Sequence, residues 1–401
     1  MGCSYTDSAA TGLVAEGEWR RRIAAIVGNQ LLPTRASVLC GDLTGKKNAG
    51  RLACCWRSMK VAGHVIIFGG TGFIGTHLTQ YLLGGNLCKE ITLVDLQPPR
   101  SEPYAALLQE GLQNGRVAFS RFDVRQPIPA SLSAIRPDII FNLAAVHREP
   151  GHARREYFET NINGAENVCA YATATECSKI VFTSSISPYG PSEELKDETS
   201  VPAPTTPYGA SKLRAEGIHI DWQANCPDRK LLILRAGVVF GPGEGGNVTR
   251  LIRSVLRGYF VYVGNRQTRK AGGYVKELCS VADFGLEHQD LSCEDVTLLN
   301  FSMNPTPTLE TYVEAIREVI GSRRAPLAIP RSLLLGSSYV IDAAARAVGV
   351  KQPITPVRVR KLFRSTFVDP KRLRDLGYKW KFSMTDALRD WKQMRAEDFM
   401  A

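Results

Sequence analysis

Tyr208 and Lys212 lie four residues apart and could together remove a proton from an alcohol. On a helix this spacing puts both side chains on one face, with about 5–6 Å between their Cβ atoms. A free tyrosine has a pKa of about 10 and is a poor base at neutral pH. A neighbouring ammonium group favours the phenolate and lowers that pKa. The pair therefore predicts Tyr208 as a general base supported by Lys212.

Further polar residues follow two stretches that we expect to be strands, 179–183 and 138–142. Ser185 comes just after the first, and its hydroxyl could hydrogen-bond to Tyr208 and to a substrate oxygen. His147 and Arg148 come after the second. In a doubly wound sheet, ligands bind outside the carboxyl ends of the strands. We therefore expect Ser185 to act in catalysis and to contact substrate, and His147 and Arg148 to bind substrate.

A glycine-rich turn, Gly69–Gly75, separates an apolar stretch from a segment with helical spacing. Glycines let the backbone approach a pyrophosphate, and the N-terminus of the next helix supplies free N–H groups and a positive dipole. Asp95 lies 20 residues beyond Gly75, at the end of the next apolar stretch. There its carboxylate can accept both adenosine ribose hydroxyls and would repel a 2′-phosphate. The turn contains no Arg or Lys, so the sequence predicts NAD rather than NADP as the cofactor.

Strand and helix patterns alternate from residue 61 onward, which predicts a Rossmann-type α/β fold: a doubly wound parallel sheet of about six strands with helices on both faces. The strands are expected at 64–68, 90–94, 116–122, 138–142, 179–183 and 231–235, and the helices at 73–83, 103–113, 154–175 and 208–225. Residues 61–240 are the expected NAD-binding domain, to which later segments return a helix and a strand. Residues 241–401 form the expected smaller α/β unit, for substrate binding, to which 247–265, 295–320 and 326–395 are assigned. Residues 1–60 are expected to be a poorly ordered extension.

Composition narrows the class of protein. The chain has 401 residues, 44% of them hydrophobic, which suits a globular protein with a sizeable core. Its net charge of +11 is spread along the chain, so we expect an anionic small ligand rather than nucleic acid. The apolar stretch 333–350 is interrupted by Asp342 and Arg346, so no membrane helix is expected. The 10 cysteines form no CxxC pair, so we expect no metal site and a cytoplasmic location with reduced thiols.

Together these motifs resemble the extended short-chain dehydrogenase/reductase family from about residue 61 to residue 391. The resemblance implies an NAD-binding site with the residues Gly69, Gly72, Phe73, Ile74, Gly75, Asp95, Asp123, Val124, Leu143, Ala144, Ala145, Asn161, Tyr208 and Lys212. Within it, 122–124 is similar to the segment that recognises adenine, 142–145 to the strand end beside the cofactor, and Asn161 to a structural asparagine. The catalytic set implied by the resemblance is Ser185, Tyr208 and Lys212.

The resemblance also bears on the substrate. Family dehydratases and decarboxylases have an acidic residue where this chain has Ile186, so the sequence is more similar to nucleotide-sugar 4-epimerases such as the UDP-glucose/galactose enzymes. Two residues depart from that pattern. Val238 stands where galactose epimerases have an asparagine that holds the sugar nucleotide. Lys276 stands in the segment where they have an arginine, and we expect it to meet a phosphate of the substrate as a point charge.

We therefore expect an NAD-dependent epimerase of a nucleotide-linked sugar that works through a keto intermediate. One alternative is a net sugar or hydroxysteroid-type dehydrogenase or reductase of the same fold. A second alternative is a dinucleotide-binding regulator without catalysis. The family resemblance further implies a homodimer that pairs through the helices 154–175 and 208–225.

Overall fold

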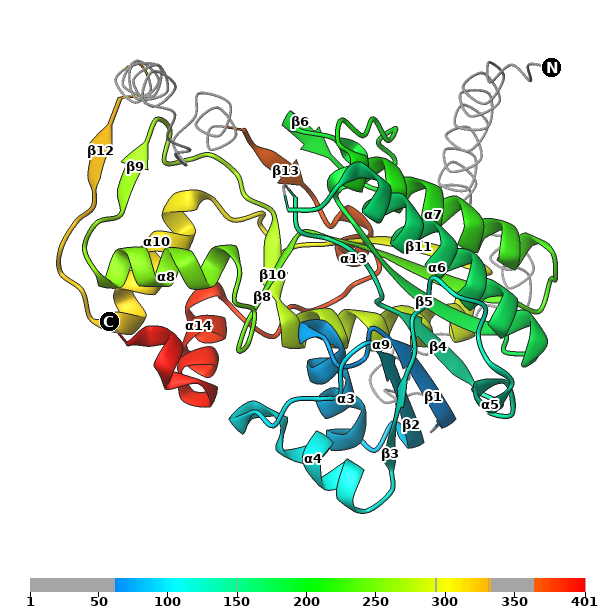
Figure 1. Ribbon diagram of the computed structural model, residues 1–401. Helices are drawn as coiled ribbons and strands as arrows, with labels where there is room; N and C mark the ends of the chain where they lie inside the picture. The colour runs from blue at the N-terminus through cyan, green and yellow to red at the C-terminus, as the bar shows by residue number, and fades with distance from the viewer. Residues whose placement is uncertain (1–61, 150, 293, 331, 333–363, 401) are drawn as a thin grey trace, which may run out of the picture.

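A parallel sheet of seven strands forms the centre of the computed structural model, which describes residues 62–149, 151–292, 294–330, 332 and 364–400 (Figure 1). The strands are β1 (Ala62–Phe68), β2 (Cys88–Asp95), β3 (Val117–Arg121), β4 (Ile139–Asn142), β5 (Lys179–Ser185), β7 (Lys230–Ala236) and β11 (Val296–Phe301). Their order is β11-β7-β5-β4-β1-β2-β3. The strand order therefore reverses at β1, beside β4, which is the point where doubly wound sheets bind their ligands.

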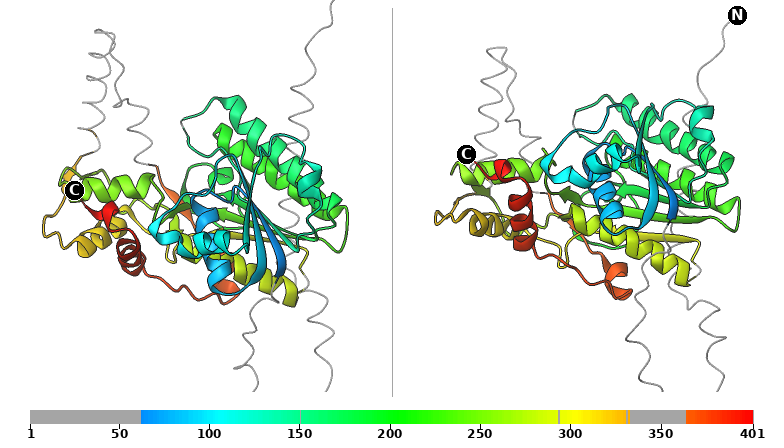
Figure 2. Two further views of the ribbon diagram at one scale, coloured as in Figure 1. Left: turned by 60° about the horizontal axis from the view of Figure 1, so that its bottom comes forward. Right: turned by 90° about the horizontal axis from the view of Figure 1, so that it is seen from below.

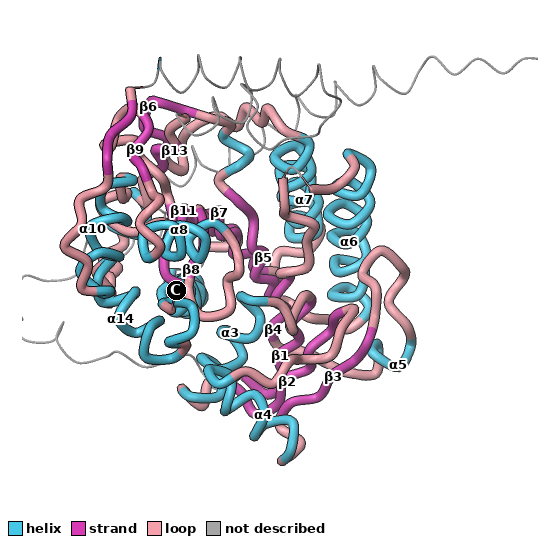
Figure 3. Tube along the Cα trace, turned by 60° about the vertical axis from the view of Figure 1, so that its left-hand side comes forward, coloured by secondary structure: helices cyan, strands magenta, loops and turns pink. Residues whose placement is uncertain are grey.

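Alternation along β1 shows why the sheet has a helical layer on each face. Successive side chains of a strand point to opposite faces. Val65 and Ile67 pack in one apolar cluster, Ile66 and Phe68 in another, and all four are fully buried. The first cluster takes in α3 (Phe73–Gly84), α4 (Ala106–Gln113) and α9 (Val275–Ser292). The second takes in α5 (Ala130–Ser133), α6 (Arg154–Ala174) and α7 (Pro207–Ala224), and Figure 3 shows α6 and α7 side by side.

The expected doubly wound fold is confirmed, and a strand from a later segment is the seventh strand of the sheet. The sequence analysis assigned residues 295–320 to the smaller unit, whereas β11 pairs in parallel with β7 from Val296↔Leu231 to Phe301↔Ala236. Its apolar side chains are buried between the helices, so this segment belongs to the sheet. The helix before it, α9, packs on the same sheet, which makes residues 275–301 a return of the chain to the Rossmann unit.

A smaller unit lies beside the sheet (Figure 2). Its elements are β8 (Val238–Phe240), α8 (Asn247–Leu256), β9 (Val261–Val263), β10 (Gly272–Tyr274), α10 (Leu309–Ile320), β12 (Leu327–Ile329), α14 (Met384–Met394) and η3 (Ala396–Phe399). Two parallel strand pairs, β8 with β10 and β9 with β12, support the three helices. Trp391 is fully buried at the centre of this unit, where it stacks on Phe240 and donates to Asp398.

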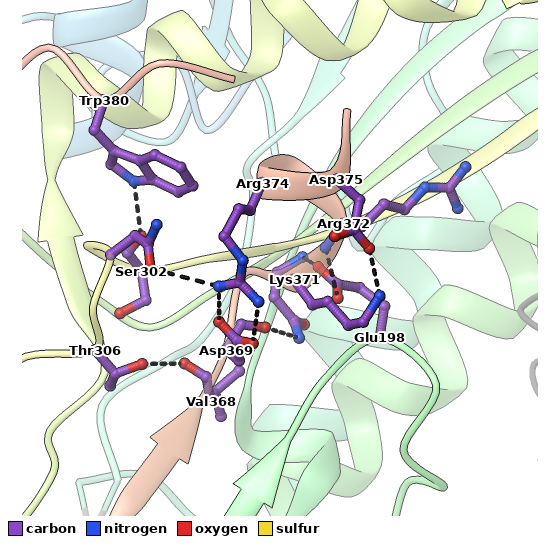
Figure 4. Close-up of polar contacts among 12 residues, drawn as sticks. Glu198, Ser302, Thr306, Val368, Asp369, Lys371, Arg372, Arg374, Asp375 and Trp380 are labelled. Atoms are coloured by element: carbon purple, nitrogen blue, oxygen red, sulfur yellow. Dashed lines mark hydrogen bonds and ion pairs between the residues drawn. The ribbon is translucent and has the colours of Figure 1, made fainter. Parts of the chain in front are cut away.

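A C-terminal strap ties the smaller unit to the edge strand β11. It consists of β13 (Thr366–Val368), which pairs with β6 (Ser192–Lys196), and α13 (Lys371–Asp375). Glu198, which is 5% exposed, accepts hydrogen bonds from the backbone N–H groups of Asn300 at 2.8 Å and Arg372 at 3.2 Å. Burial raises the pKa of Glu198 to about 7. Figure 4 shows Glu198 beside α13, with the Arg374–Asp369 ion pair next to it.

Some expectations fall outside what the structure describes. The expectation for residues 1–60 and the interpretation of 333–350 both lie in ranges that it does not describe. Within the described ranges, none of the helices combines the length and the hydropathy needed to cross a bilayer.

Candidate active site

The glycine-rich turn brings α3 and the loop after β4 into close contact. Gly69 has a φ of +75°, and a Cβ atom there would lie 2.8 Å from the backbone nitrogen of Ala144. A Cβ atom on Gly75 would lie 2.5 Å from the carbonyl oxygen of Gly70. Side chains at these positions would push the two loops and the helix apart, so only glycine fits. The turn therefore places the N-terminus of α3 at the carboxyl ends of β1 and β4.

The start of α3 suits an anion. Gly72 is the N-cap, and the first turn, which begins with Phe73 and Ile74, has no acidic side chain. The first N–H groups of a helix have no partner inside the helix and carry its positive dipole. A pyrophosphate could accept hydrogen bonds from these groups without meeting a side chain at the glycines. This cradle fits the diphosphate of NAD.

Asp95 is fixed beside the same turn. One carboxylate oxygen accepts from the backbone N–H of Thr71 at 3.1 Å, and the other accepts from Leu96 at 2.7 Å. Each oxygen keeps a further lone pair for a ribose hydroxyl. The structure thus holds Asp95 beside the glycine-rich turn, and its contact with the adenosine ribose stays a prediction.

The expected adenine segment follows β3. Asp123 accepts from the Arg125 guanidinium at 2.6 Å, and this hydrogen bond lowers the pKa of Asp123. The Val124 side chain is buried and packs against α6, where a Cβ atom on Gly164 would lie 3.1 Å from it. Asn167 donates to the Val124 carbonyl at 2.8 Å. The segment is therefore anchored to both β3 and α6.

Asn161 links the loop after β4 to the catalytic helix. Its side chain accepts from Val146 N at 2.9 Å and donates to Ser211 Oγ at 2.8 Å. Ser211 in turn donates to the Tyr208 carbonyl at 2.9 Å. These bonds fix the positions of residues 143–145 and of the first turn of α7. Asn161 is 3% exposed and positions this loop and helix, and its expected place in the NAD site stays a prediction.

The structure brings Ser185 and Tyr208 together. Ser185 is the last residue of β5, and Tyr208 lies in the first turn of α7, where Thr206 is the N-cap and Pro207 the first residue. A Cβ atom on Gly209 would lie 2.7 Å from the Ser187 carbonyl oxygen, so the helix starts directly against the loop after β5. The Ser185 hydroxyl donates to Ser187 Oγ at 3.1 Å and lies close enough to Tyr208 to lower the pKa of its phenol.

Lys212 lies on the same side of α7 but does not donate to Tyr208. Its ammonium group donates to the Thr183 carbonyl at 2.7 Å and lies 4.2 Å from the centre of the Phe182 ring. Burial raises the pKa of Tyr208 to about 12, against the effect of the nearby Ser185 hydroxyl. Burial also lowers the pKa of Lys212 to about 7, against the effect of Glu216. The expected lowering of the Tyr208 pKa by Lys212 is therefore not found, because desolvation is the largest cause and raises that pKa.

Besides Ser185, the expected substrate contacts lie in two different environments. His147 and Arg148 are exposed on the loop after β4, where the Arg148 carbonyl accepts from the Tyr157 hydroxyl. Lys276 is the second residue of α9 and forms an ion pair with Asp390 of α14 at 2.7 Å. A phosphate would have to compete with Asp390 for Lys276, so this contact stays a prediction. Val238, in β8, is 36% exposed.

Sequence reasoning missed a buried ion pair under the catalytic helix. Arg235 of β7 donates to both carboxylate oxygens of Glu216, at 2.9 and 2.7 Å. The one available signal was the position of Glu216, four residues after Lys212 on the same helix face. In the described part of the chain, His, Cys, Asp and Glu side chains form no cluster that could hold a metal ion.

The chain matches the NAD dependent epimerase/dehydratase family over residues 65–297 and belongs to that family. It is 25% identical to the N-acetyl-alpha-D-glucosaminyl-diphospho-ditrans,octacis-undecaprenol 4-epimerase of Escherichia coli O157:H7, over 81% of this chain and 93% of that protein. It is also 25% identical to the 3beta-hydroxysteroid-dehydrogenase/decarboxylase isoform 1 of Arabidopsis thaliana, over 78% of this chain and 75% of that protein.

Solved structures agree with the fold. The UDP-glucuronic acid 4-epimerase of Bacillus cereus, in complex with NAD, superposes with a TM-score of 0.64. The alignment covers 84% of this chain and 100% of that one, at 19% identity. The expected family and fold are thus confirmed, and NAD is the cofactor that both the family and the cradle at Gly69–Gly75 indicate.

Proposed function

We propose that this protein is an epimerase that inverts a carbinol of a nucleotide-linked sugar through a transient ketone. The observation that carries the proposal is the proximity of Ser185 and Tyr208 at the carboxyl edge of the sheet, where the start of α7 lies directly against the loop after β5. Relatives named as epimerases of diphosphate-linked sugars support the substrate class.

In this mechanism the protein side chains handle the proton and the positions of the reacting atoms. Tyr208 takes the proton of the sugar hydroxyl as the carbinol is oxidised, and returns it after the ketone has turned over. Ser185 hydrogen-bonds to the same oxygen. Lys212 lies one helical turn away and supplies positive charge to the site. NAD, when bound, supplies the hydride acceptor and donor, so the net redox change is zero.

A net dehydrogenase is the alternative, and the match to a 3beta-hydroxysteroid-dehydrogenase/decarboxylase is the observation that favours it. The two functions differ in what happens to the hydride. An epimerase returns it to the substrate, whereas a dehydrogenase releases NADH. A regulator without catalysis would need no base, and the proximity of Ser185 to Tyr208 argues against it.

The test uses a panel of nucleotide sugars, with products separated by chromatography and NADH followed by absorbance. With a C4-deuterated substrate the epimerase keeps the label in the product and releases no NADH. Stoichiometric NADH would make the protein a dehydrogenase, and tight NAD binding without turnover of any sugar or steroid would favour the regulator.

Tyr208→Phe tests the base. It removes the hydroxyl and keeps the ring, so turnover should fall by about 10²–10⁴-fold while NAD still binds. Tyr171→Phe is the matched control, because its hydroxyl donates to the Leu132 carbonyl in the core under α6, and it should retain full turnover. Near-normal activity of Tyr208→Phe would rule out this mechanism.

We further propose a homodimer formed through α6 and α7. The proposal rests on the family resemblance and on the packing of these two helices against each other on one face of the sheet (Figure 3). Light scattering at micromolar concentration is the test, and a monomeric mass would overturn it. The cytoplasmic location and the absence of membrane and nucleic-acid partners stay predictions.

A further inference from the structure

Glu216 is the centre of a buried charge cluster below the catalytic helix. Its carboxylate accepts from Arg235 Nε and Nη2 of β7, and from Ser184 Oγ of β5 at 2.5 Å. Glu216 and Arg235 are both 0% exposed. The ring of Tyr189 covers the guanidinium of Arg235 at 4.6 Å. Side chains from two strands of the sheet, β5 and β7, thus donate to this one carboxylate.

The same carboxylate acts on Lys212. The two residues are one helical turn apart on α7, and the carboxylate attracts the buried ammonium. The charged, titratable and polar groups that face Lys212 from its own helix, from β5 and from the loop after β4 are those of Tyr208, Glu216, His219, Thr183 and His147. The ring of Phe182 covers the ammonium group. Burial lowers the pKa of His219 to about 4, so this ring is neutral at physiological pH. Among these facing groups, Glu216 is the carboxylate.

We propose that Glu216 and Arg235 are positioning residues that set the charge of Lys212, and through it the readiness of Tyr208 to act as a base. Two cations, Lys212 and Arg235, and one anion, Glu216, leave one net positive charge beneath the active site. That charge favours an anionic oxygen at Tyr208. The inference rests on the proposed function, because it assigns the cluster a part in the same reaction.

Because Glu216 and Arg235 carry opposite charges, they should shift the pKa of Lys212 in opposite directions, and this difference can be tested. Burial disfavours the Lys212 ammonium, and Glu216 offsets that effect by Coulomb attraction. Arg235 draws on the same carboxylate and repels Lys212. Removing the anion should therefore make Lys212 lose its proton more readily, and removing the second cation should make it hold its proton longer.

The experiment measures the titration of Lys212 directly, with [¹⁵N]lysine-labelled protein and the Nζ resonance assigned by its loss in Lys212→Met. In Glu216→Gln the midpoint should fall by about 1–2 pH units, and in Arg235→Gln it should rise, as one nearby charge usually shifts a pKa by this much. The alkaline limb of the kcat–pH profile should move in the same direction as each midpoint. If the ion pair were purely structural, Glu216→Gln and Arg235→Gln would shift the Lys212 midpoint in the same direction or not at all.

Two further variants keep the test decisive. Glu216→Gln leaves Arg235 buried without an anion, which strongly destabilises proteins, so the double variant Glu216→Gln/Arg235→Gln replaces the ion pair with two amides. Its Lys212 midpoint should fall, by less than in the single Glu216→Gln variant. Asp290→Asn is the matched control. Asp290 pairs with Lys179 and Lys230, which are the first residues of β5 and β7 and lie at the end of the sheet away from the candidate site. Its loss should leave the Lys212 midpoint unchanged.

Unchanged midpoints, or shifts of the same sign in Glu216→Gln and Arg235→Gln, would overturn the inference. The titration needs no substrate. If no sugar is turned over, the proposed function fails while the NMR midpoints still decide the role of Glu216 and Arg235.

Discussion

Replacing Gly75 by alanine would separate α3 from the glycine-rich turn. The added Cβ atom would lie 2.5 Å from Gly70 O, 2.6 Å from Gly70 C and 2.7 Å from Gly69 O. Carbon and carbonyl oxygen normally approach to about 3.3 Å, so the helix start must withdraw by roughly 0.8 Å. Backbone atoms cannot rotate away, and overpacking costs about 1–3 kcal/mol. This exceeds the gain of roughly 0.5–1 kcal/mol from placing alanine instead of glycine in a helix.

The withdrawal should also weaken cofactor binding, because the N–H groups that face the pyrophosphate belong to the same helix turn. We expect the dissociation constant for NAD in Gly75→Ala to rise at least tenfold, or about 1.4 kcal/mol, in titration calorimetry. Gly84→Ala, at the other end of α3, is the matched control. Its Cβ atom would contact only Leu107, at 3.4 Å, so it should bind NAD normally and melt at or slightly above the original temperature. If Gly75→Ala bound NAD and melted like the unmutated protein, the close approach of α3 to the turn would control neither cofactor binding nor stability, and the reasoning would be refuted.

Two further predictions concern single carboxylates. Asp95→Ala removes the acceptor beside the turn, so the Kd for NAD should rise about 10–100-fold with little change for NADP. Equal affinity of the unmutated protein for NAD and NADP in calorimetry would refute the assignment. Glu198→Gln concerns stability: because its pKa is raised from 4.5 to about 7 in the folded state, the folded protein favours the protonated acid. Stability present below about pH 4.5 is then lost as pH rises through 7, by at most about 3 kcal/mol. In denaturant unfolding, Glu198→Gln should lack this loss, and parallel pH curves for both proteins would contradict it.

Much of the fold could be predicted because its determinants are local in the sequence. The apolar stretches of β1 and β2 bury both of their faces, which marks parallel strands between two helical layers. Gly75 is required because backbone atoms only a few residues away, those of Gly70, leave no room for a Cβ atom. The spacing of the glycines in the sequence therefore predicts the turn. The positions of Ser185 and Tyr208 also follow from the sequence, because each lies at the end or start of a regular element at the carboxyl edge of the sheet.

Charge and protonation were decided only by the tertiary structure. The sequence places Lys212 one turn after Tyr208, but its burial, its bond to Thr183 and the proximity of Glu216 depend on how α7 packs on β5 and β7. The partner of Lys276 is Asp390, from a helix more than a hundred residues later in the chain. A pKa depends on desolvation and on all nearby charges, and both are properties of the packed molecule. The sequence by itself therefore determined which groups reach the site, and the tertiary structure decided which of them carry charge there.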